Sequence, residues 1–293
     1  MNDDYIALDW GSTHLRAWLF RQGVCRNNCH LKAGITQLNN RHPRDILRSI
    51  TDEWAATELP VLMAGMVGSQ SGWVNTPYQP CLVTLETLGQ HLMAVDKNVW
   101  VVPGLSLNEE NAVNILRGEE TQLLGAWRLQ PASLYVMPGT HCKWVRVEQG
   151  CVMHFTTVIT GELHHILMQH SLIGKGLPEQ VTDESAFLSG VQQALKNKAL
   201  LPKLFELRAG HILGNFDASV LSERLSGMLI GAEISQMQHV YDVIEHTPVT
   251  LVGSDFLTAR YQLAMQHAGI AAHIVSGDAA FLQGIRSMIN ELV

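Results

Sequence analysis

Charged and aromatic residues are both scarce in this sequence, and it contains no long apolar or basic run. Of its 293 residues, 16% are charged, 6% are aromatic and 46% are apolar, which is the composition of a globular protein with enough material for a core. The formal net charge is −7 and lysine and arginine do not cluster, so we expect no nucleic-acid-binding surface. No apolar run approaches the roughly 18 residues of a membrane span, and the acidic N-terminus lacks the pattern of a signal peptide.

Cysteine is also scarce, and its five residues give an odd count. That count excludes a fully paired disulfide framework and makes a reducing cytoplasm the simplest location. Cys25 and Cys29 are not followed by a second pair at zinc-binding spacing. Residues 161–165, Gly-Glu-Leu-His-His, do not match the His-Glu-x-x-His pattern of zinc enzymes. We interpret them as the start of a helix that lines a pocket.

The N-terminal segment predicts a β-hairpin with a glycine turn. The apolar run at residues 5–8 precedes Asp-Trp-Gly-Ser-Thr at residues 9–13, and an apolar strand pattern restarts at residues 15–20. Glycine lets the backbone approach a ligand closely, and consecutive N–H groups in the turn can bind a phosphate. Asp9 would then lie beside the phosphates, where it can hold Mg²⁺ through water. An ordinary hairpin with the same turn chemistry is the alternative interpretation.

A second hairpin of the same kind is predicted further along the chain, separated from the first by about the length of one lobe. Residues 134–137 and 143–147 have strand patterns, and Pro-Gly-Thr-His at residues 138–141 predicts the turn between them. Two such hairpins, one in each lobe, can face each other and bind the phosphates of one nucleotide from both sides. The pair is stronger evidence for a nucleotide site than either hairpin alone.

Between the hairpins, the acidic run Arg-Gly-Glu-Glu at residues 117–120 predicts the start of a helix. Carboxylates suit that end of a helix dipole. A carboxylate there can accept the proton of a substrate hydroxyl as the hydroxyl attacks phosphorus. A plain acidic first turn is the alternative, and the position between the two hairpins weakens it.

The C-terminal part predicts two strands that end in glycine, each followed by a helix. The strands cover residues 249–252 and 274–276, and the helices cover 256–267 and 279–288. Such junctions can place backbone beside a base and ribose, although each alone is an ordinary strand–helix turn. An apolar helix at residues 225–234 carries Gly227 and Gly231 at a spacing that permits close helix packing.

Chain length predicts two lobes, because 293 residues exceed the size at which one core usually keeps growing. We place the first lobe at residues 1–117 and the second at 118–293, with the terminal helix packing back on the first lobe.

In their order along the chain, these features resemble the five-motif pattern of the acetate and sugar kinase/Hsc70/actin superfamily. More narrowly, the sequence is similar to the 2-dehydro-3-deoxygalactonokinase family. The segments that carry this similarity are residues 5–13, 63–69, 117–126, 136–145 and 160–165. The likeness covers essentially the whole chain, and Met-Pro-Gly-Thr-His and Gly-Glu-Leu-His-His are its distinctive runs. The resemblance implies an α/β, two-lobed sugar kinase/Hsc70/actin-like (ribonuclease H-like) fold with an interlobe cleft.

The resemblance also implies a cytoplasmic kinase that uses ATP and Mg²⁺ to phosphorylate 2-dehydro-3-deoxy-D-galactonate at its 6-hydroxyl in galactonate catabolism. Its partners would be the small sugar acid and ATP, with no nucleic acid and no membrane, and assembly into a homo-oligomer stays open. Asp9 would be the carboxylate associated with magnesium. The residues expected to contact ATP are Gly11, Ser12, Thr13, Gly139, Thr140, Gly253, Ser254, Gly277 and Asp278. The residues considered for sugar-acid binding are Arg16, Gly65, Gly68, Ser69, Arg117, Lys143, Glu162 and His164.

Two departures from the superfamily pattern affect the mechanism. Many members carry an acidic residue just before the second Gly-Thr turn, where this chain has Met137 and Pro138. Relatives usually offer one aspartate at the helix start, where this chain has Glu119 and Glu120, so the catalytic base is open between these two with a slight preference for Glu119.

Two other functions compete with the kinase. A phosphohydrolase of the same superfamily, acting on polyphosphate or nucleotides, also carries a Glu-Glu pair at the helix start. It would differ by releasing phosphate without any sugar acid. A sugar-sensing regulator is disfavoured because the chain has neither a basic helix-turn-helix stretch nor paired cysteines.

Overall fold

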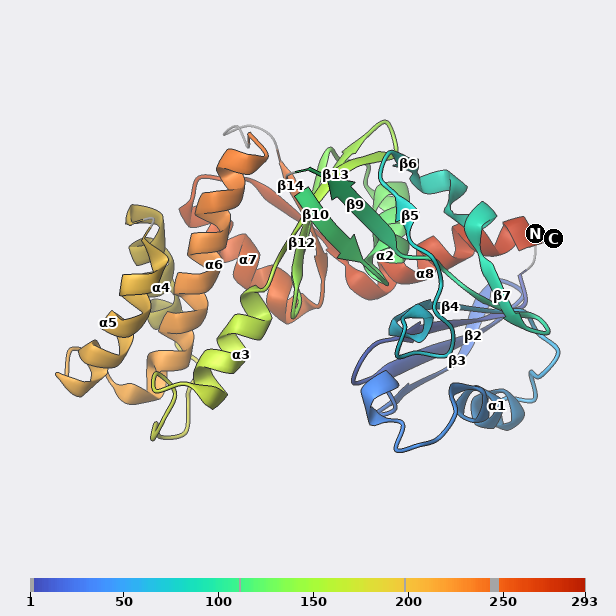
Figure 1. The fold of residues 1–293 in the computed structure, drawn as a ribbon, viewed down its shortest axis with the longest axis horizontal. Coiled ribbons are helices and arrows are strands. Elements are labelled where there is room, and N and C mark those ends of the chain that lie inside the picture. Colours follow the sequence, from blue (N-terminus) through green and yellow to red (C-terminus); the bar gives the residue numbers. More distant parts are fainter. Residues whose placement is uncertain (1–2, 111, 198, 243–247, 293) are drawn as a thin grey trace. The chain divides into compact units, whose positions relative to one another are not determined.

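The chain divides into two compact units in the computed structural model, which describes residues 3–110, 112–197, 199–242 and 248–292 (Figure 1). Unit 1 consists of Met1–Ser133, Val147–Phe155 and Val275–Val293, and unit 2 consists of Leu134–Arg146 and Thr156–Ile274. The boundaries of these units differ from the boundary between the two lobes that were proposed from the sequence. The helix that follows Gly118 lies in unit 1, and so does the last helix of the chain.

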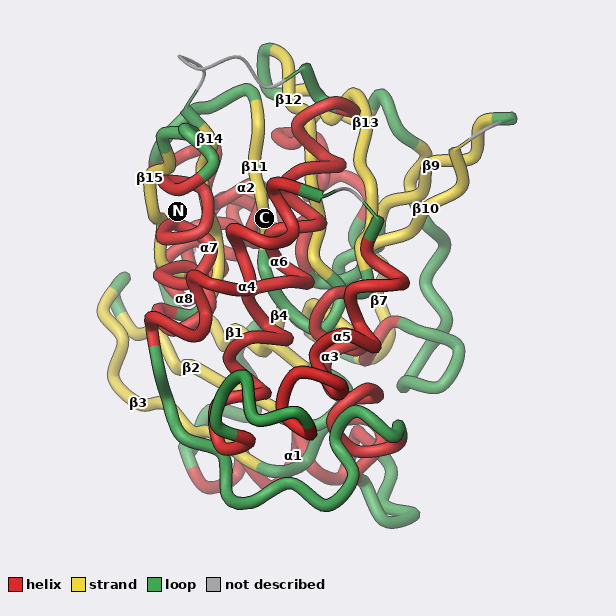
Figure 2. The backbone as a smooth tube through the Cα atoms, turned by 90° about the vertical axis from the view of Figure 1, so that its left-hand side faces the viewer, coloured by secondary structure: helices red, strands yellow, loops and turns green. Residues whose placement is uncertain are grey.

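Unit 1 is built on a mixed sheet with the strand order β3-β2-β1-β4-β8-β7. The strands are β1 (Tyr5–Trp10), β2 (Leu15–Arg21), β3 (Val24–Leu31), β4 (Val61–Gly65), β7 (Met93–Asp96) and β8 (Val99–Val101). Strands β1, β2 and β3 lie side by side as antiparallel neighbours, whereas β4 runs parallel to β1 (Figure 2). The predicted first hairpin is confirmed, and Asp9 lies opposite Arg16 in its register.

Helices cover both faces of this sheet. On one face, Ile46 and Ile50 of α1 (Pro43–Glu53) join the core formed by alternate residues of β1 and β2. On the other face, Phe281 of α8 (Gly277–Ile289) lies 5.4 Å from the ring of Trp18. Helix α2 (Glu119–Leu129) packs on α8 so closely that a side chain at Gly125 would meet the backbone of α8. The predicted helices at residues 119 and 279–288 are therefore confirmed.

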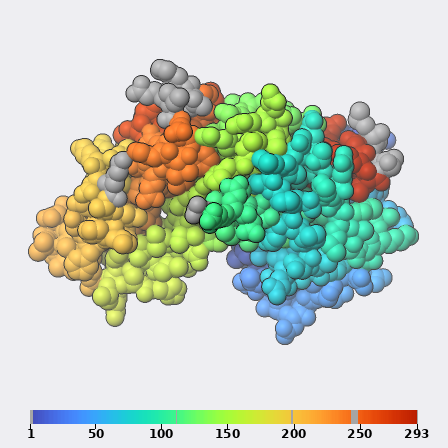
Figure 3. All heavy atoms as spheres, turned by 45° about the horizontal axis from the view of Figure 1, so that its top comes forward, coloured from blue at the N-terminus to red at the C-terminus, as the bar shows by residue number. Residues whose placement is uncertain are grey.

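Smaller elements complete unit 1. Strands β5 (Gln79–Pro80), β9 (Leu105–Glu109) and β10 (Ala112–Leu116) form a second sheet in the order β10-β9-β5. Its β9–β10 hairpin lies at the surface (green in Figure 3). The short helices are η1 (Ile35–Gln37), η2 (Met66–Gly68), η3 (Leu85–His91) and η5 (Asn290–Leu292), and β6 (Val83–Thr84) pairs with the start of β13 (Cys151–Val158).

Unit 2 contains the second predicted hairpin. Strand β11 (Leu134–Met137) pairs antiparallel with β12 (Cys142–Glu148) and parallel with β14 (Val249–Gly253). The strand order is β15-β14-β11-β12-β13, where β15 is Ala272–Ser276. Both strands predicted in the C-terminal part are confirmed, as is the helix that follows the first of them.

The helices of unit 2 pack on its sheet and on one another (Figure 1). They are α3 (Thr160–His170), α4 (Glu184–Lys196), α5 (Leu200–Ile212), η4 (Ala218–Val220), α6 (Leu221–Val240) and α7 (Asp255–His267). Phe187 of α4, Ile234 of α6 and Tyr261 of α7 share a core with Trp144 of β12. Gly227 of α6 lies against the backbone of Phe187, so the small residues in this helix serve close packing on α4. Over the described residues, no helix has the length and apolar character needed to cross a bilayer.

Candidate active site

Three of the predicted functional residues meet in unit 1 at the end of β1. The guanidinium of Arg16 donates hydrogen bonds to the carboxylates of both Asp9 and Asp278, forming two ion pairs. Asp278 lies in the first turn of α8, so this contact joins the first hairpin to the last helix. Beside it, Asp9 and Arg16 help to line a hollow of about 320 Å³, whose other lining residues are Gly11, Ser12, Thr13, His14 and His30.

The charges around Asp9 shift its pKa in opposite directions. Its side chain is only 20% exposed, and burial raises the pKa of Asp9. The positive charge of Arg16 lowers that pKa, whereas the negative charges of Asp278 and Glu119 raise it further. Glu119 therefore lies close enough to Asp9 to interact with it electrostatically, and two carboxylates, those of Asp9 and Asp278, pair with the guanidinium of Arg16.

Two glycines bring the start of α2 against the end of β1. Gly65 and Gly118 have φ angles of +99° and +102°, which side chains rarely adopt. A Cβ atom on Gly118 would lie 3.2 Å from the Cα of Gly65. A Cβ atom on Gly65 would lie 2.8 Å from the carbonyl oxygen of Trp10 and 3.5 Å from the Asp9 carboxylate. The acidic helix start is thus held beside Asp9 by backbone contacts that a larger residue would break.

The two glutamates at this helix start have different surroundings. Glu119 is half-buried, and its carboxylate accepts a hydrogen bond from the backbone N–H of Arg117 at 3.0 Å. Glu120 is fully buried and accepts from the N–H of Gly118 at 2.6 Å and from the hydroxyl of Thr121 at 3.1 Å. Burial, reinforced by the charge of Glu119, raises the pKa of Glu120 to about 8. Glu120 is therefore mostly protonated at neutral pH and shielded from any ligand.

Arg117, a predicted substrate residue, is committed to contacts within unit 1. Its guanidinium donates to the hydroxyl of Thr76 and, at 2.9 Å, to the Thr76 carbonyl, and it lies 4.2 Å from the centre of the Tyr78 ring. The same guanidinium lies against Gly68. The Ser69 hydroxyl donates to the carbonyl of Met66 at 2.7 Å within the same loop. These contacts fix the loop that follows β4, directly after Gly65.

The second group of predicted residues meets in unit 2 around the turn between β11 and β12. The carbonyl of Thr140 accepts from the backbone N–H of Glu162 at 2.9 Å, and the Glu162 carboxylate lies 2.6 Å from Nε2 of His141. Lys143 is 4% exposed and donates to the carbonyl of His141 at 3.1 Å. Gly253 packs beside this turn, because a Cβ atom there would lie 3.4 Å from the carbonyl of the residue before Gly139. Ser254 follows it as the N-cap of α7.

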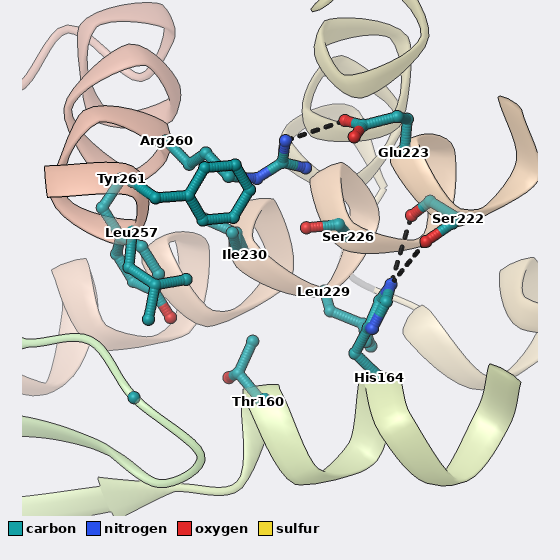
Figure 4. A pocket seen from close by; sticks show the side chains of 13 residues that line it. Thr160, His164, Ser222, Glu223, Ser226, Leu229, Ile230, Leu257, Arg260 and Tyr261 are labelled. Atoms are coloured by element: carbon teal, nitrogen blue, oxygen red, sulfur yellow. Dashed lines mark hydrogen bonds and ion pairs between the residues drawn. The ribbon is translucent and has the colours of Figure 1, made fainter. Parts of the chain in front are cut away.

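A cavity of about 190 Å³ opens beside the same turn (Figure 4). Its lining residues are Gly139, Thr160, Gly161, His164, Ser222, Glu223, Ser226, Leu229, Ile230, Phe256, Leu257, Arg260 and Tyr261. Glu223 and Arg260 form an ion pair at 2.8 Å, and Nε2 of His164 lies 3.2 Å from the hydroxyl of Ser222. Burial lowers the pKa of His164. Of these residues, the sequence had indicated Gly139 and His164.

No local pattern indicates the Glu223–Arg260 pair, because the two residues belong to separate helices and to no recognisable motif. Ser226 lies in the helix that was predicted at residues 225–234. The small residues of this helix were the sequence feature that could have indicated it. Of the predicted nucleotide contacts, Gly253 lies in unit 2, and Asp278 lies in unit 1 beside Arg16.

Within the part of the chain that the structure describes, no three His, Cys, Asp or Glu side chains are grouped to hold a metal ion by themselves. Cys25 and Cys29 are both free thiols.

Residues 9–288 match the model of the 2-keto-3-deoxy-galactonokinase family. The chain belongs to this family. It is 48% identical to the 2-dehydro-3-deoxygalactonokinase of Escherichia coli (strain K12) over 291 residues, which are 99% of both chains. A crystal structure of a Sinorhizobium meliloti protein that carries the same enzyme name covers 98% of this chain and 99% of its own, with a TM-score of 0.92 and 30% identity.

The fold extends to a more distant protein. The activator of 2-hydroxyisocaproyl-CoA dehydratase from Clostridium difficile, solved with bound ADPNP, has a TM-score of 0.52 at 13% identity and covers 97% of this chain and 92% of its own. The predicted α/β sugar kinase/Hsc70/actin-like fold is thus confirmed. This family member is a sugar-acid kinase with ATP as its phosphoryl donor, and the phosphohydrolase alternative is not favoured.

The buried Glu120 generates a prediction about stability and pH. Between its ordinary pKa of 4.5 and its folded pKa of about 8, the folded protein binds one more proton than the unfolded chain. The free energy of unfolding must therefore fall as pH rises through this window. The E120Q variant lacks this titration, so its stability relative to the wild type should rise from pH 5 to pH 8, as measured by urea denaturation at several pH values.

The matched control is the E58Q variant. Because the side chain of Glu58 is 80% exposed, this variant should leave the pH dependence of stability unchanged. Parallel curves for E120Q and the wild type would show that Glu120 is not a buried neutral acid.

Proposed function

We propose that this kinase transfers the γ-phosphoryl group of ATP to the 6-hydroxyl of 2-dehydro-3-deoxy-D-galactonate, giving the 6-phospho product in galactonate catabolism. The 48% identity to the E. coli enzyme over 99% of both chains carries the choice of substrate. The pairing of Asp9 and Asp278 with Arg16, and the position of Glu119 near Asp9, support phosphoryl transfer as the chemistry, because that reaction needs mainly positioning and charge neutralisation.

The proposed phosphate contacts are the backbone turns of the two hairpins. In unit 1 these are Gly11, Ser12 and Thr13, and in unit 2 they are Gly139 and Thr140. Gly253 and Ser254 are proposed adenosine contacts, supported by their position beside the Gly139 turn and the cavity next to it. Gly277 and Asp278 stay proposed nucleotide contacts, and the ion pair of Asp278 with Arg16 favours the phosphates as the part of the nucleotide that it approaches.

Magnesium fits the carboxylates of unit 1. Mg²⁺ in kinases is held by one or two carboxylates, with water and substrate phosphates completing its ligands. Asp9 would hold the ion, and Asp278, whose side chain is 58% exposed, lies on the other branch of Arg16. When bound, the ion neutralises charge on the phosphates. The chain itself contributes the fixed orientation of Asp9, which Arg16 sets.

Glu119 is the better candidate for the base. A general base must be ionised and must reach the proton that it accepts. Glu120 meets neither condition, because it is fully buried with a raised pKa of about 8. Glu119 is half-buried, lies near Asp9 and is oriented by the N–H of Arg117. We therefore assign Glu119 to accept the proton of the 6-hydroxyl.

The sugar acid has two proposed sets of contacts. In unit 1 they are Arg16, Gly65, Gly68, Ser69 and Arg117, and the loop geometry supports backbone N–H contacts more than side-chain contacts from Arg117. In unit 2 they are Lys143, Glu162 and His164, which lie near the Gly139 turn. A cytoplasmic location without nucleic-acid partners completes the proposal, supported by composition and net charge.

A coupled assay of ADP release tests the function. The wild-type protein, with ATP and Mg²⁺, is given a panel of 2-keto-3-deoxy sugar acids and common hexoses. We expect ADP release to depend on the sugar acid and to be greatest with 2-dehydro-3-deoxy-D-galactonate. Phosphate release that is equally fast without any acceptor would instead identify a phosphohydrolase.

Replacing Asp9 tests the magnesium site. D9N keeps the shape of the side chain and removes its charge, so turnover should fall about tenfold or more and the Mg²⁺ concentration for half-maximal rate should rise. Circular dichroism should show an intact fold. The control is D52N, which alters a helix carboxylate with a 58% exposed side chain. If D9N works normally at limiting Mg²⁺, Asp9 is only a turn residue.

The two glutamates offer a matched pair of variants for the base. E119Q should lower kcat by about 10²–10⁴ with little change in KM for either substrate, because proton acceptance is lost and shape is kept. E120Q should keep near-normal kcat, because Gln resembles the protonated carboxyl that is already present. Steady-state kinetics at pH 7 decides between them, and normal turnover in both variants would remove the acidic helix start from the mechanism.

A further inference from the structure

A buried carboxylate in unit 2 makes hydrogen bonds that the reaction itself does not use. Glu233 of α6 is 3% exposed. It accepts from the indole N–H of Trp144 at 2.7 Å, from the hydroxyl of Tyr261 at 2.7 Å and from the hydroxyl of Thr160. These donors come from β12, α7 and the first residue of α3. One side chain therefore links four elements.

Such a carboxylate is costly to bury, and it needs several donors to be tolerated. Burial raises the pKa of Glu233, and hydrogen bonds from its neighbours, including Cys142 and Thr160, oppose that rise. Well-packed apolar residues could fill the same volume without this cost. The carboxylate instead fixes the orientation of its neighbours, because each donor has to point at one of its two oxygens.

Because Glu233 fixes the position of Thr160, it also affects the proposed phosphate turn. The residues that follow Thr160 lie directly on the turn, since a Cβ atom on Gly161 would lie 2.5 Å from the carbonyl oxygen of Gly139. The N–H of Glu162 then donates to the carbonyl of Thr140 at 2.9 Å. Any shift of the first residue of α3 is therefore passed to Gly139 and Thr140.

The same network borders the cavity of unit 2. Thr160 and Tyr261 both line it, and Figure 4 shows Thr160 at the start of α3 on the side of the cavity opposite α6. Glu233 does not line the cavity. It acts on the lining only through the two hydroxyl groups that it holds.

We propose that Glu233 is a positioning residue for nucleotide binding, which fixes Thr160 and thereby the turn of Gly139 and Thr140 that contacts the phosphates. This inference rests on the proposed function, because it takes these two residues as phosphate contacts.

The test compares variants that each remove a buried hydroxyl from the same core. T160V deletes the hydroxyl that donates to Glu233. Y241F deletes one that donates to the carbonyl of Trp144 at 2.7 Å and lies 3.0 Å from the hydroxyl of Thr156. E233Q alters the acceptor itself, and T160S restores the hydroxyl. For the full-length variants we would measure the dissociation constant of ADP by calorimetry, KM for ATP and for the sugar acid, and the midpoint of thermal unfolding.

We expect T160V and Y241F to lower the unfolding midpoint to a similar extent. T160V and E233Q should weaken ADP binding and raise KM for ATP by about tenfold, as expected when a charge-assisted hydrogen bond no longer holds a binding group in place. Y241F and T160S should bind ADP as the wild type does. If E233Q fails to fold, the pair T160V and T160S decides the question alone.

Nucleotide affinity in T160V equal to that in Y241F would overturn the proposal and leave Glu233 with a structural role. A G139A variant separates this outcome from failure of the proposed function, because its added Cβ atom would meet only the carbonyl of His141, at 3.8 Å, and would obstruct a phosphate that approaches the backbone of the turn. If G139A binds ADP normally, the phosphate turn itself is wrongly assigned. If G139A is impaired and T160V is not, only the role of Glu233 is refuted.

Discussion

The candidate site of unit 1 depends on the contact between Arg16 and Asp9. These residues lie opposite each other on antiparallel strands, so the pairing that builds the sheet also builds the ion pair. A carboxylate at this depth needs a countercharge to stay ionised, and the guanidinium supplies it. The second branch of the guanidinium holds Asp278, which ties α8 to the hairpin. Helix α8 in turn supports α2, whose first turn carries Glu119.

The buried carboxylate of unit 2 is stabilised by the opposite arrangement of charge. In unit 1 a cation holds two carboxylates, whereas in unit 2 the carboxylate of Glu233 accepts hydrogen bonds from uncharged donors on β12, α3 and α7. In both units the supported residue follows a strand or begins a helix, where backbone N–H groups are available to a ligand. Rigid support of this kind matters for phosphoryl transfer, because a displacement of about 1 Å can cost about 10² in rate.

Local patterns made much of the fold predictable. Alternating apolar residues and glycine turns act over a few positions, and they correctly gave both hairpins and the helix starts. The contact between Arg16 and Asp278 spans 262 positions and leaves no local trace. Glu119 and Glu120 are equivalent in a sequence and differ only once packing has buried one of them. Arg117 adjoins a motif, yet the distant Thr76 engages its guanidinium. Glu233 belongs to no motif and becomes visible only through its donors.

The place of α8 in unit 1 has a consequence for synthesis on the ribosome. A chain emerges from its N-terminus, so the sheet of β1 and β2 is complete long before residues 275–293 are translated. During that interval Trp18 lacks its cover from Phe281, and Arg16 lacks Asp278. The first sheet of the nascent polypeptide thus stays without its α8 contacts until the last residues of the chain are made.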